Sequence, residues 1–368
     1  MTRLPSPRLL MGPGPSSVSP AVLAAMSEPP IGYLDPELFE LLEGIRAGLR
    51  ILFETKSRFT VPLTGTGMAG MEACIANCVG QGDRVVVVSA GYFGDRIAEL
   101  AGRLGANVDV VRGEWGKAVE TSALRTDLER GSPPVLVAAV HAETSTGVRQ
   151  DLAPFAAVAH EYGALFLADM VTSLGGIPVD VDGWDIDIAY SAVQKCVGAP
   201  PGLAPVTVTD AVLESMHQRG LPHANWYVDF KLLGAYYDSP HTYHHTVPVN
   251  NYYALFAALG EAFEEGLDER FKRHQTASNA LIAGLREFGI EPLAPEAIRL
   301  PTLNAVALPP GVDDLLVRNN LLSHHGIEIG GGIGKLKGKI WRIGTMGFAA
   351  DMKNVERLLA ALKTELYR

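Results

Sequence analysis

The sequence predicts an α/β fold built on a mostly parallel sheet between helices. Continuous apolar runs, such as residues 135–140 and the four valines within the expected strand 84–88, alternate with segments whose apolar residues recur at helical spacing. Uninterrupted runs of Val, Leu, Ile and Ala are typical of strands buried on both faces, as in parallel sheets. The chain has 368 residues, of which 47% are apolar, so it is long enough for about two domains and a large core.

The elements follow one another in a regular order. Residues 1–20 form an N-terminal arm that is too rich in proline and glycine, up to Ser16, for regular structure, and we expect it to cross a surface, its own or a partner's. Helical patterning covers residues 20–26 and 36–53. The expected strands that follow are residues 84–88, 108–111, 135–140, 165–168, 186–189 and 204–208, with helices at residues 95–104 and 154–162.

The character of the sequence changes after residue 254. Two long helices are expected at residues 254–266 and 271–288, followed by shorter strands and helices. We therefore expect a large domain over residues 21–260 and a smaller C-terminal α+β domain over residues 261–368. The glycine cluster at residues 330–334 predicts a mobile loop.

Composition excludes several classes of function. The net charge of −10 argues against a protein that binds nucleic acid or an anionic membrane as its main activity. No apolar run reaches the ~20 residues that span a bilayer, and the first residues lack the apolar core of a signal peptide. The three cysteines cannot all pair, which favours a reducing compartment. We expect a cytoplasmic protein.

A lysine and an aspartate follow two neighbouring strands of the predicted sheet. Lys195 comes just after the apolar run 186–192, and Asp169 ends the run 164–168. Ligands of such sheets bind beyond the carboxyl ends of the strands. A lysine there can form a Schiff base, and a carboxylate can keep a pyridinium nitrogen protonated, which together are what pyridoxal phosphate requires. Taken alone, the pair is equally compatible with a structural aspartate and an incidental lysine.

A glycine run supports two interpretations. Residues 65, 67 and 70 form a G-x-G-x-x-G pattern between an expected strand and an expected helix, which is the signature of a nicotinamide-dependent oxidoreductase using NAD(P). That signature also expects an acidic residue ~20 positions further on, at the end of the next strand, where this chain has Ser89, Ala90 and Gly91. What remains is a helix start whose free N–H groups can hold one phosphate, or a purely structural turn.

Three further segments carry candidate contacts. Tyr92 or Phe93, in the loop after residue 88, offers a ring that can stack on a flat cofactor. The hydroxyls of residues 144–146 can hydrogen-bond a cofactor oxygen or serve as turn residues. Arg342 lies in an apolar stretch and suits a carboxylate or a salt bridge.

The histidines at residues 241–245 raise the question of a metal. No carboxylate or cysteine set accompanies them in the sequence, so we expect polar contacts to an anion and no metal site.

Together these segments resemble the class V aminotransferases of pyridoxal-phosphate fold type I. The sequence is most similar to the alanine–glyoxylate and serine–pyruvate aminotransferases. The resemblance rests on residues 10–16, 64–72, 91–96, 141–147, 169–176, 194–202, 243–246 and 342–344. It implies a pyridoxal 5'-phosphate enzyme with a large domain, a mostly parallel sheet and a smaller C-terminal domain.

The resemblance also implies the catalytic and substrate-binding residues. Lys195 is expected to hold the cofactor as a Schiff base and to carry the proton between the substrate and the cofactor. Asp169 is expected to pair with the pyridine nitrogen. Arg342 is expected to bind the substrate carboxylate, with Gly14 beside the substrate.

The remaining implied roles concern the cofactor. Its ring is expected to stack on Phe93, with Thr144 near its phenolic oxygen, and its phosphate is expected to lie among Thr66, Gly67, Met68 and Gln194. Tyr243 and Thr246 are expected to reach the phosphate of a neighbouring subunit, which makes a homodimer part of the site. Met68, Phe93 and Thr144 stand where the animal enzymes carry histidine, tryptophan and serine, so the preferred amino donor stays open.

The expected reaction is a ping-pong transfer of an amino group from alanine or serine to a 2-oxo acid such as glyoxylate or pyruvate. 2-Aminoethylphosphonate and ureidoglycine transaminases of the same class are alternatives, and an NAD(P)-dependent oxidoreductase is the alternative from another class. Cysteine desulfurases are excluded because they need a cysteine well after the lysine, and none follows Cys196.

Overall fold

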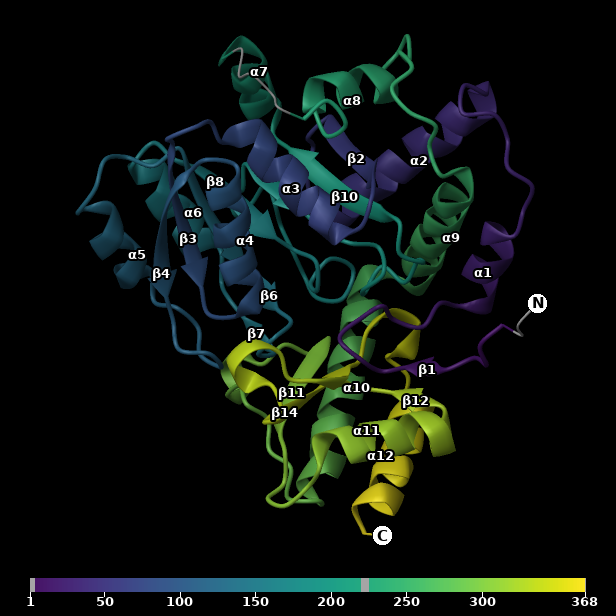
Figure 1. Cartoon of the computed structure of the whole chain (residues 1–368). Coiled ribbons are helices and arrows are strands. Elements are labelled where there is room, and N and C mark those ends of the chain that lie inside the picture. The colour runs from purple at the N-terminus through teal and green to yellow at the C-terminus, as the bar shows by residue number, and fades with distance from the viewer. Residues whose placement is uncertain (1–3, 220–224, 368) are drawn as a thin grey trace.

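The computed structural model describes residues 4–219 and 225–367, and a large mixed sheet lies at its centre (Figure 1). Its strand order is β2-β10-β9-β8-β5-β3-β4. β10 is antiparallel to both of its neighbours, and the pairs from β9 to β4 are parallel, which confirms the predicted mostly parallel sheet. The strands are β2 (Phe59–Thr64), β3 (Arg84–Ser89), β4 (Asn107–Arg112), β5 (Leu136–Val140), β8 (Leu165–Asp169), β9 (Ile188–Tyr190) and β10 (Leu203–Val208).

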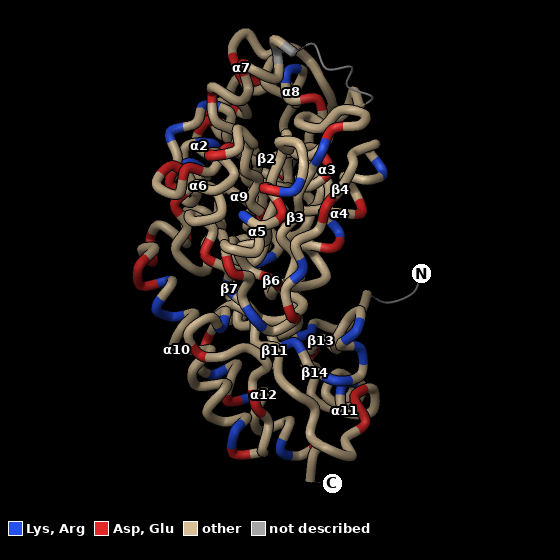
Figure 2. Tube along the Cα trace, turned by 90° about the vertical axis from the view of Figure 1, so that its left-hand side faces the viewer, with Lys and Arg blue, Asp and Glu red and all other residues tan. Residues whose placement is uncertain are grey.

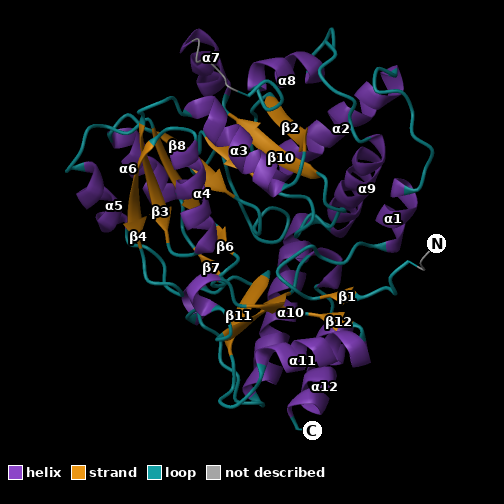
Figure 3. Cartoon of the chain, in the orientation of Figure 1, coloured by secondary structure: helices purple, strands orange, loops and turns teal. Residues whose placement is uncertain are grey.

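Helices cover both faces of this sheet. α3 (Gly67–Cys78) contacts α4 (Tyr92–Arg103), whereas α5 (Thr121–Leu128) contacts α6 (Ala153–Glu161). The strand order reverses after β4, so right-handed crossovers place these two helix pairs on opposite faces. The other helices of this part are α1 (Pro20–Met26), α2 (Pro36–Phe53), α7 (Asp210–Arg219), α8 (Phe230–Tyr237) and α9 (Val249–Glu265), as Figure 3 shows.

Local sequence explains why α1 and α2 begin where the sequence predicts. Ser19 and Asp35 are the N-caps, and their side chains accept hydrogen bonds from the backbone N–H groups of Val22 and Glu37. A proline opens each helix, where its missing N–H is not needed.

A second apolar cluster lies in the C-terminal part of the chain. There β11 (Leu303–Ala307), β14 (Ile340–Gly344) and β13 (Gly330–Gly331) form an antiparallel sheet, which packs with α10 (Leu267–Arg286), α11 (Asp314–Asn320) and α12 (Met352–Leu366) around the buried Trp341. Short elements complete the chain: β6 (Ala142–Glu143), β7 (Val148–Arg149), a π-helical turn at Leu321–His325 and 3-10 turns at Glu296–Ile298, Gly334–Leu336 and Gly347–Ala349. The domain boundaries at residues 20 and 260 stay predictions.

Two sequence-based expectations are wrong in detail. The N-terminal arm contains a short strand, β1 (Leu9–Leu10), which pairs with β12 (Ile327–Glu328), and Met11 joins the C-terminal apolar cluster. The glycine cluster is partly a strand, because Gly330 and Gly331 pair with β14. An added Cβ at Gly330 would collide with the ring of Pro13, so the close packing of the arm explains this glycine.

Surface character agrees with the composition. None of the helices in residues 4–219 and 225–367 is both long and apolar enough to cross a membrane. In Figure 2, lysine and arginine residues are intermingled with aspartate and glutamate residues over the face in view.

Arg46 connects α2 to two distant segments. This buried side chain donates from Nη2 to Arg58 O at 2.8 Å and from Nη1 to Tyr237 O at 3.1 Å. Its Nη2 also lies 3.0 Å from Asp238 Oδ1. The guanidinium therefore fixes the segment that enters β2, the strand that leads to the glycine run.

We expect Arg46→Met to lower the free energy of unfolding by about 3 kcal/mol, because it leaves buried carbonyl groups without a donor. The shift of the urea midpoint followed by fluorescence measures this. Arg103→Met is the control, since the Arg103 side chain is 75% exposed and should shift stability by less than about 0.5 kcal/mol. Equal shifts for the two variants would contradict the role of Arg46.

Candidate active site

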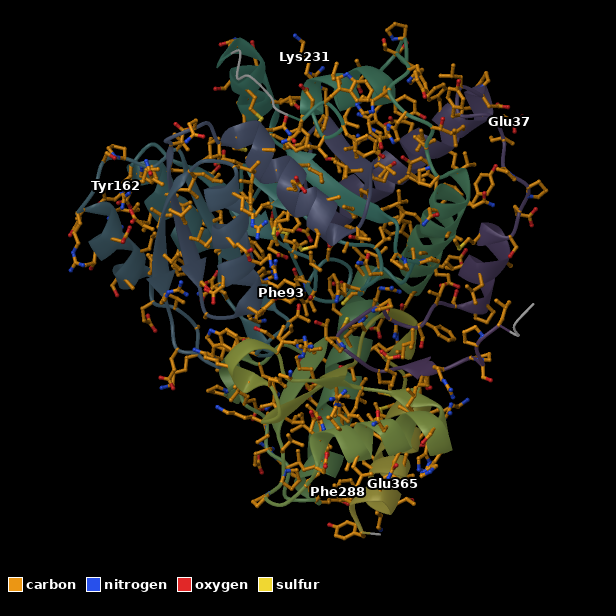
Figure 4. All side chains as sticks on the ribbon, in the orientation of Figure 1. Glu37, Phe93, Tyr162, Lys231, Phe288 and Glu365 are labelled. Atoms are coloured by element: carbon orange, nitrogen blue, oxygen red, sulfur yellow. The ribbon has the colours of Figure 1, made fainter. Side chains whose placement is uncertain are left out.

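The loops after β8, β9 and β3 surround one cavity of about 130 Å³. Figure 4 labels Phe93 near the middle of the molecule, between the large sheet and the C-terminal part. The predicted site residues that line this cavity are Thr66, Gly67, Met68, Phe93, Thr144, Asp169, Gln194 and Lys195. The structure thus brings together residues that are spread over more than a third of the chain.

Asp169 ends β8 and is almost completely buried, with 2% of its surface exposed. The Tyr190 hydroxyl donates to its Oδ2 at 2.6 Å, and the Val171 N–H donates to its Oδ1 at 2.9 Å. Burial raises the pKa of Asp169 to about 6, although these hydrogen bonds and the charge of Lys195 act in the opposite direction. Asp169 is therefore a carboxyl group that titrates near neutral pH.

Lys195 lies next to the N-terminal arm. Its ammonium group donates to Pro13 O, and burial lowers its pKa to about 8. A partly neutral amine can act as a nucleophile and as a base. Gly14 has φ +110°, and an added Cβ there would lie 2.7 Å from Lys195 Cδ, so this glycine lets the arm pass over the lysine.

The glycine run forms the start of α3. Thr66 is the N-cap residue and makes no side-chain capping bond, so the helix start is available to an anion. An added Cβ at Gly67 would lie 2.9 Å from Ala192 Cβ, so the helix start is close to the segment that precedes Lys195. A dinucleotide site needs this turn between adjacent parallel strands, but β2 pairs with the antiparallel β10 and is separated from β3.

Two further groups line the cavity wall. Thr144 Oγ1 lies 2.6 Å from Thr172 Oγ1, which fixes its position. The buried Gln194 Oε1 has no hydrogen-bond partner within the described part of the chain. A buried polar atom without a partner is costly, which suits a site that binds a polar ligand.

Four predicted residues lie outside the lining of the cavity: Gly14, Arg342, Tyr243 and Thr246. Arg342, on β14, is 8% exposed, donates from Nε to Gly331 O at 2.8 Å, and has its pKa lowered to about 10 by burial. Its charge also contributes to the lowered pKa of Lys195, so the two cations interact. Tyr243 and Thr246 are exposed, and the ring of Tyr243 lies 5.2 Å from that of Tyr33.

Comparison with known proteins identifies the group of proteins that share this arrangement. The family model described as Aminotransferase class-V matches residues 13–358. The chain belongs to the class V aminotransferase family. The (S)-ureidoglycine–glyoxylate transaminase of Bacillus subtilis (strain 168) is 36% identical, covering 98% of this chain and 91% of the relative. The alanine–glyoxylate aminotransferase of Rattus norvegicus is also 36% identical, covering 98% of this chain and 87% of the relative.

A solved structure agrees with this assignment. The alanine–glyoxylate aminotransferase from Nostoc sp. superposes with a TM-score of 0.97 at 45% identity, covering 100% of this chain and 97% of that chain. The protein is therefore an aminotransferase with the fold of pyridoxal-phosphate fold type I, as the sequence resemblance implied.

Sequence reasoning missed two polar residues of this aminotransferase site. Tyr190 bonds Asp169 because the parallel register of β8 and β9 places the two residues opposite each other. Glu143 is 4% exposed and accepts backbone hydrogen bonds from the first turn of α4. Neither spacing nor composition signals these contacts, since both depend on how distant segments pack.

The raised pKa of Asp169 predicts a pH-dependent stability of the aminotransferase freed of bound small molecules. The folded state holds this proton more tightly than the unfolded state, whose aspartate pKa is about 3.9. The stabilisation of the folded state by the protonated Asp169 is full below about pH 4, and it is lost as the pH rises through about 6. Asp169→Asn does not titrate, so the variant should be more stable than wild type by about 3 kcal/mol above pH 7, with no difference below pH 4.

Urea midpoints measured across this pH range provide the test. Tyr190→Phe removes a bond that lowers the pKa of Asp169 and should move the transition to higher pH. A difference between Asp169→Asn and wild type that does not change with pH would contradict the assignment of the titrating group.

Proposed function

We propose that this aminotransferase binds pyridoxal 5'-phosphate in the cavity beside Lys195. In this proposal it transfers the amino group of a small amino acid, alanine or serine, to a 2-oxo acid such as glyoxylate or pyruvate, in ping-pong order. The observation that carries the proposal is the meeting of a half-buried lysine of lowered pKa, a buried aspartate and an uncapped helix start around one cavity.

The residues present fit each part of the cofactor. The start of α3 at Thr66, Gly67 and Met68 suits a phosphate, and the orphaned Gln194 Oε1 marks a polar position nearby on the wall. Asp169 is held as an acceptor by two hydrogen bonds, which suits a ring nitrogen that carries a proton. When bound, pyridoxal phosphate supplies a ring that withdraws electrons from the substrate α-carbon.

Lys195 and Asp169 are the proposed catalytic residues. The burial that lowers the pKa of Lys195 leaves part of its amine neutral near pH 8, so Nζ can hold the cofactor aldehyde and then move a proton from and to the substrate α-carbon. Asp169 keeps the proton on the ring nitrogen, and Tyr190 and Val171 orient its two oxygens.

The other proposed roles are binding and orientation. Phe93 provides a face for the ring, and Thr144 provides a hydroxyl near its phenolic oxygen. Arg342 and Gly14 are proposed to receive the substrate, with the guanidinium binding its carboxylate through two parallel hydrogen bonds.

We also propose a homodimer in which Tyr243 and Thr246 reach the phosphate site of the partner subunit. Both residues are exposed and lie outside the cavity of their own chain, which supports this role. Other exposed apolar side chains that a partner could cover are Leu23, Leu34, Ile51 and Phe256. The small number of cysteines, all three of them buried, supports a reducing, cytoplasmic location.

One other donor is a specific candidate. The Bacillus subtilis relative is named as an (S)-ureidoglycine–glyoxylate transaminase, and it is as similar to this chain as the rat alanine–glyoxylate enzyme. A panel of alanine, serine, (S)-ureidoglycine and 2-aminoethylphosphonate, each offered with glyoxylate or pyruvate, separates these donors. The highest kcat/KM identifies the preferred pair, and activity with none of them would overturn the proposed substrates.

Lys195→Ala should abolish multiple turnover with every pair in this panel, because no other described amine lines the cavity. Wild-type absorbance of bound cofactor in the visible range, bleached by borohydride, is the companion measurement. Lys56→Ala is the matched control, since the Lys56 side chain lies away from the cavity and its loss should leave the rate unchanged. Turnover of the Lys195 variant near the wild-type rate would exclude its catalytic role.

Arg342→Lys should raise KM for both the amino donor and the 2-oxo acid, while cofactor absorbance stays unchanged. Lysine keeps the charge but lacks the planar fork that binds a carboxylate with two hydrogen bonds. Steady-state kinetics in both half-reactions measure the effect. A change for only one substrate, or loss of the cofactor, would show that Arg342 is not the shared carboxylate site.

A further inference from the structure

Glu143 is a buried acid that the proposed reaction leaves without a role. It lies on β6 directly before Thr144, and only 4% of its surface is exposed. Burial raises its pKa, while hydrogen bonds from Ser145, Gly94 and Phe93 act in the opposite direction. A carboxylate in such a place is costly unless several donors satisfy it.

The donors come from the first turn of α4 and from the turn that follows β6. Glu143 Oε2 accepts from the Phe93 N–H at 3.2 Å and from the Gly94 N–H at 3.3 Å. Its Oε1 accepts from the Ser145 N–H at 3.0 Å and from the Ser145 hydroxyl at 2.6 Å. The Ser145 oxygen in turn accepts from the Tyr92 N–H at 2.9 Å, so Glu143 and Ser145 together bind the first turn of α4.

This arrangement replaces an ordinary helix cap. Gly91 is the N-cap residue of α4 and has no side chain to cap the helix. An added Cβ at Gly91 would lie 2.6 Å from Glu143 Oε2, so the absence of a side chain there is what lets the carboxylate approach. The start of α4 is therefore capped by an acid that is 50 residues away in the sequence, instead of by a residue of its own segment.

The charge of Glu143 also reaches the proposed catalytic groups. It adds to the rise in the pKa of Asp169, and it partly opposes the lowering of the pKa of Arg342 by burial.

We propose that Glu143 is a positioning residue for the aminotransferase reaction, which holds Phe93 and Thr144 in place on the wall of the cofactor cavity through the first turn of α4 and through Ser145. The inference rests on the proposed cofactor site. It goes beyond that site by assigning the orientation of the ring contact to a group that does not touch the ring.

The test is a double-mutant cycle on cofactor affinity. Pyridoxal phosphate is titrated into the cofactor-free full chain of wild type, Glu143→Gln, Phe93→Leu and the double variant, and binding is followed by visible absorbance and circular dichroism. Glutamine keeps the size of the side chain but turns an amide NH₂ toward N–H donors. We expect Glu143→Gln to raise Kd at least about tenfold and to reduce the circular dichroism of the bound cofactor.

If Glu143 acts through Phe93, its substitution should change Kd much less in the Phe93→Leu background. The same factor in both backgrounds, or an unchanged Kd in Glu143→Gln alone, would overturn the inference. A wild-type protein that does not bind pyridoxal phosphate would overturn the proposed function itself, so the two failures are distinguishable.

Two further variants complete the experiment. Asp313→Asn is the matched control, because Asp313 caps α11 with a bond to the Leu316 N–H, far from the cavity, and should leave Kd unchanged. Ser145→Ala serves if Glu143→Gln does not fold, since it keeps the carboxylate but removes its hydroxyl donor and the acceptor for the Tyr92 N–H. An unchanged Kd in Ser145→Ala would then also overturn the inference.

Discussion

The burial of the Asp169 carboxylate constrains the whole site of this aminotransferase. An ionised group away from water must be surrounded by donors, and here these are the Tyr190 hydroxyl and the Val171 N–H. The first exists because β8 and β9 are in parallel register, and the second because the chain turns directly after β8. The half-buried Lys195 and the buried Arg342 then lie in a region where each charge changes the pKa of the other groups. The large sheet holds Asp169 and Tyr190 at fixed positions relative to each other.

The sequence predicts most of the fold because many signals are local. The helix at residues 36–53 agrees with α2 at both ends, since Asp35 caps it and Pro36 opens it. The helix expected at residues 95–104 begins three residues earlier in the structure, as Tyr92–Arg103, because its start is held by Glu143 rather than by a neighbour in sequence. β1 was missed for the same reason, since its partner is Ile327–Glu328.

In the candidate site, too, residues that local sequence marks could be predicted, and residues that depend on distant packing could not. Lys195 and Asp169 follow apolar strands, so their place at one edge of the sheet could be predicted from the sequence pattern. The contacts of Tyr190 and Glu143 could not be predicted, because strand register and loop packing decide which atoms lie next to each other. Arg342 was expected near the substrate from the resemblance, and the structure places it on β14, close enough to influence the pKa of Lys195.

The N-terminal arm has a consequence for how this chain is made. Leu9 and Met11 donate to carbonyl groups of Gly326 and Glu328, and Met11 O accepts from the Gly344 N–H. Pro13 O, in the same arm, receives the Lys195 ammonium group. During synthesis, residues 9–11 therefore remain without these backbone partners until residues 326–344 have been made. The arm that passes over Lys195 is thus fixed in place by segments more than 300 residues away in the sequence.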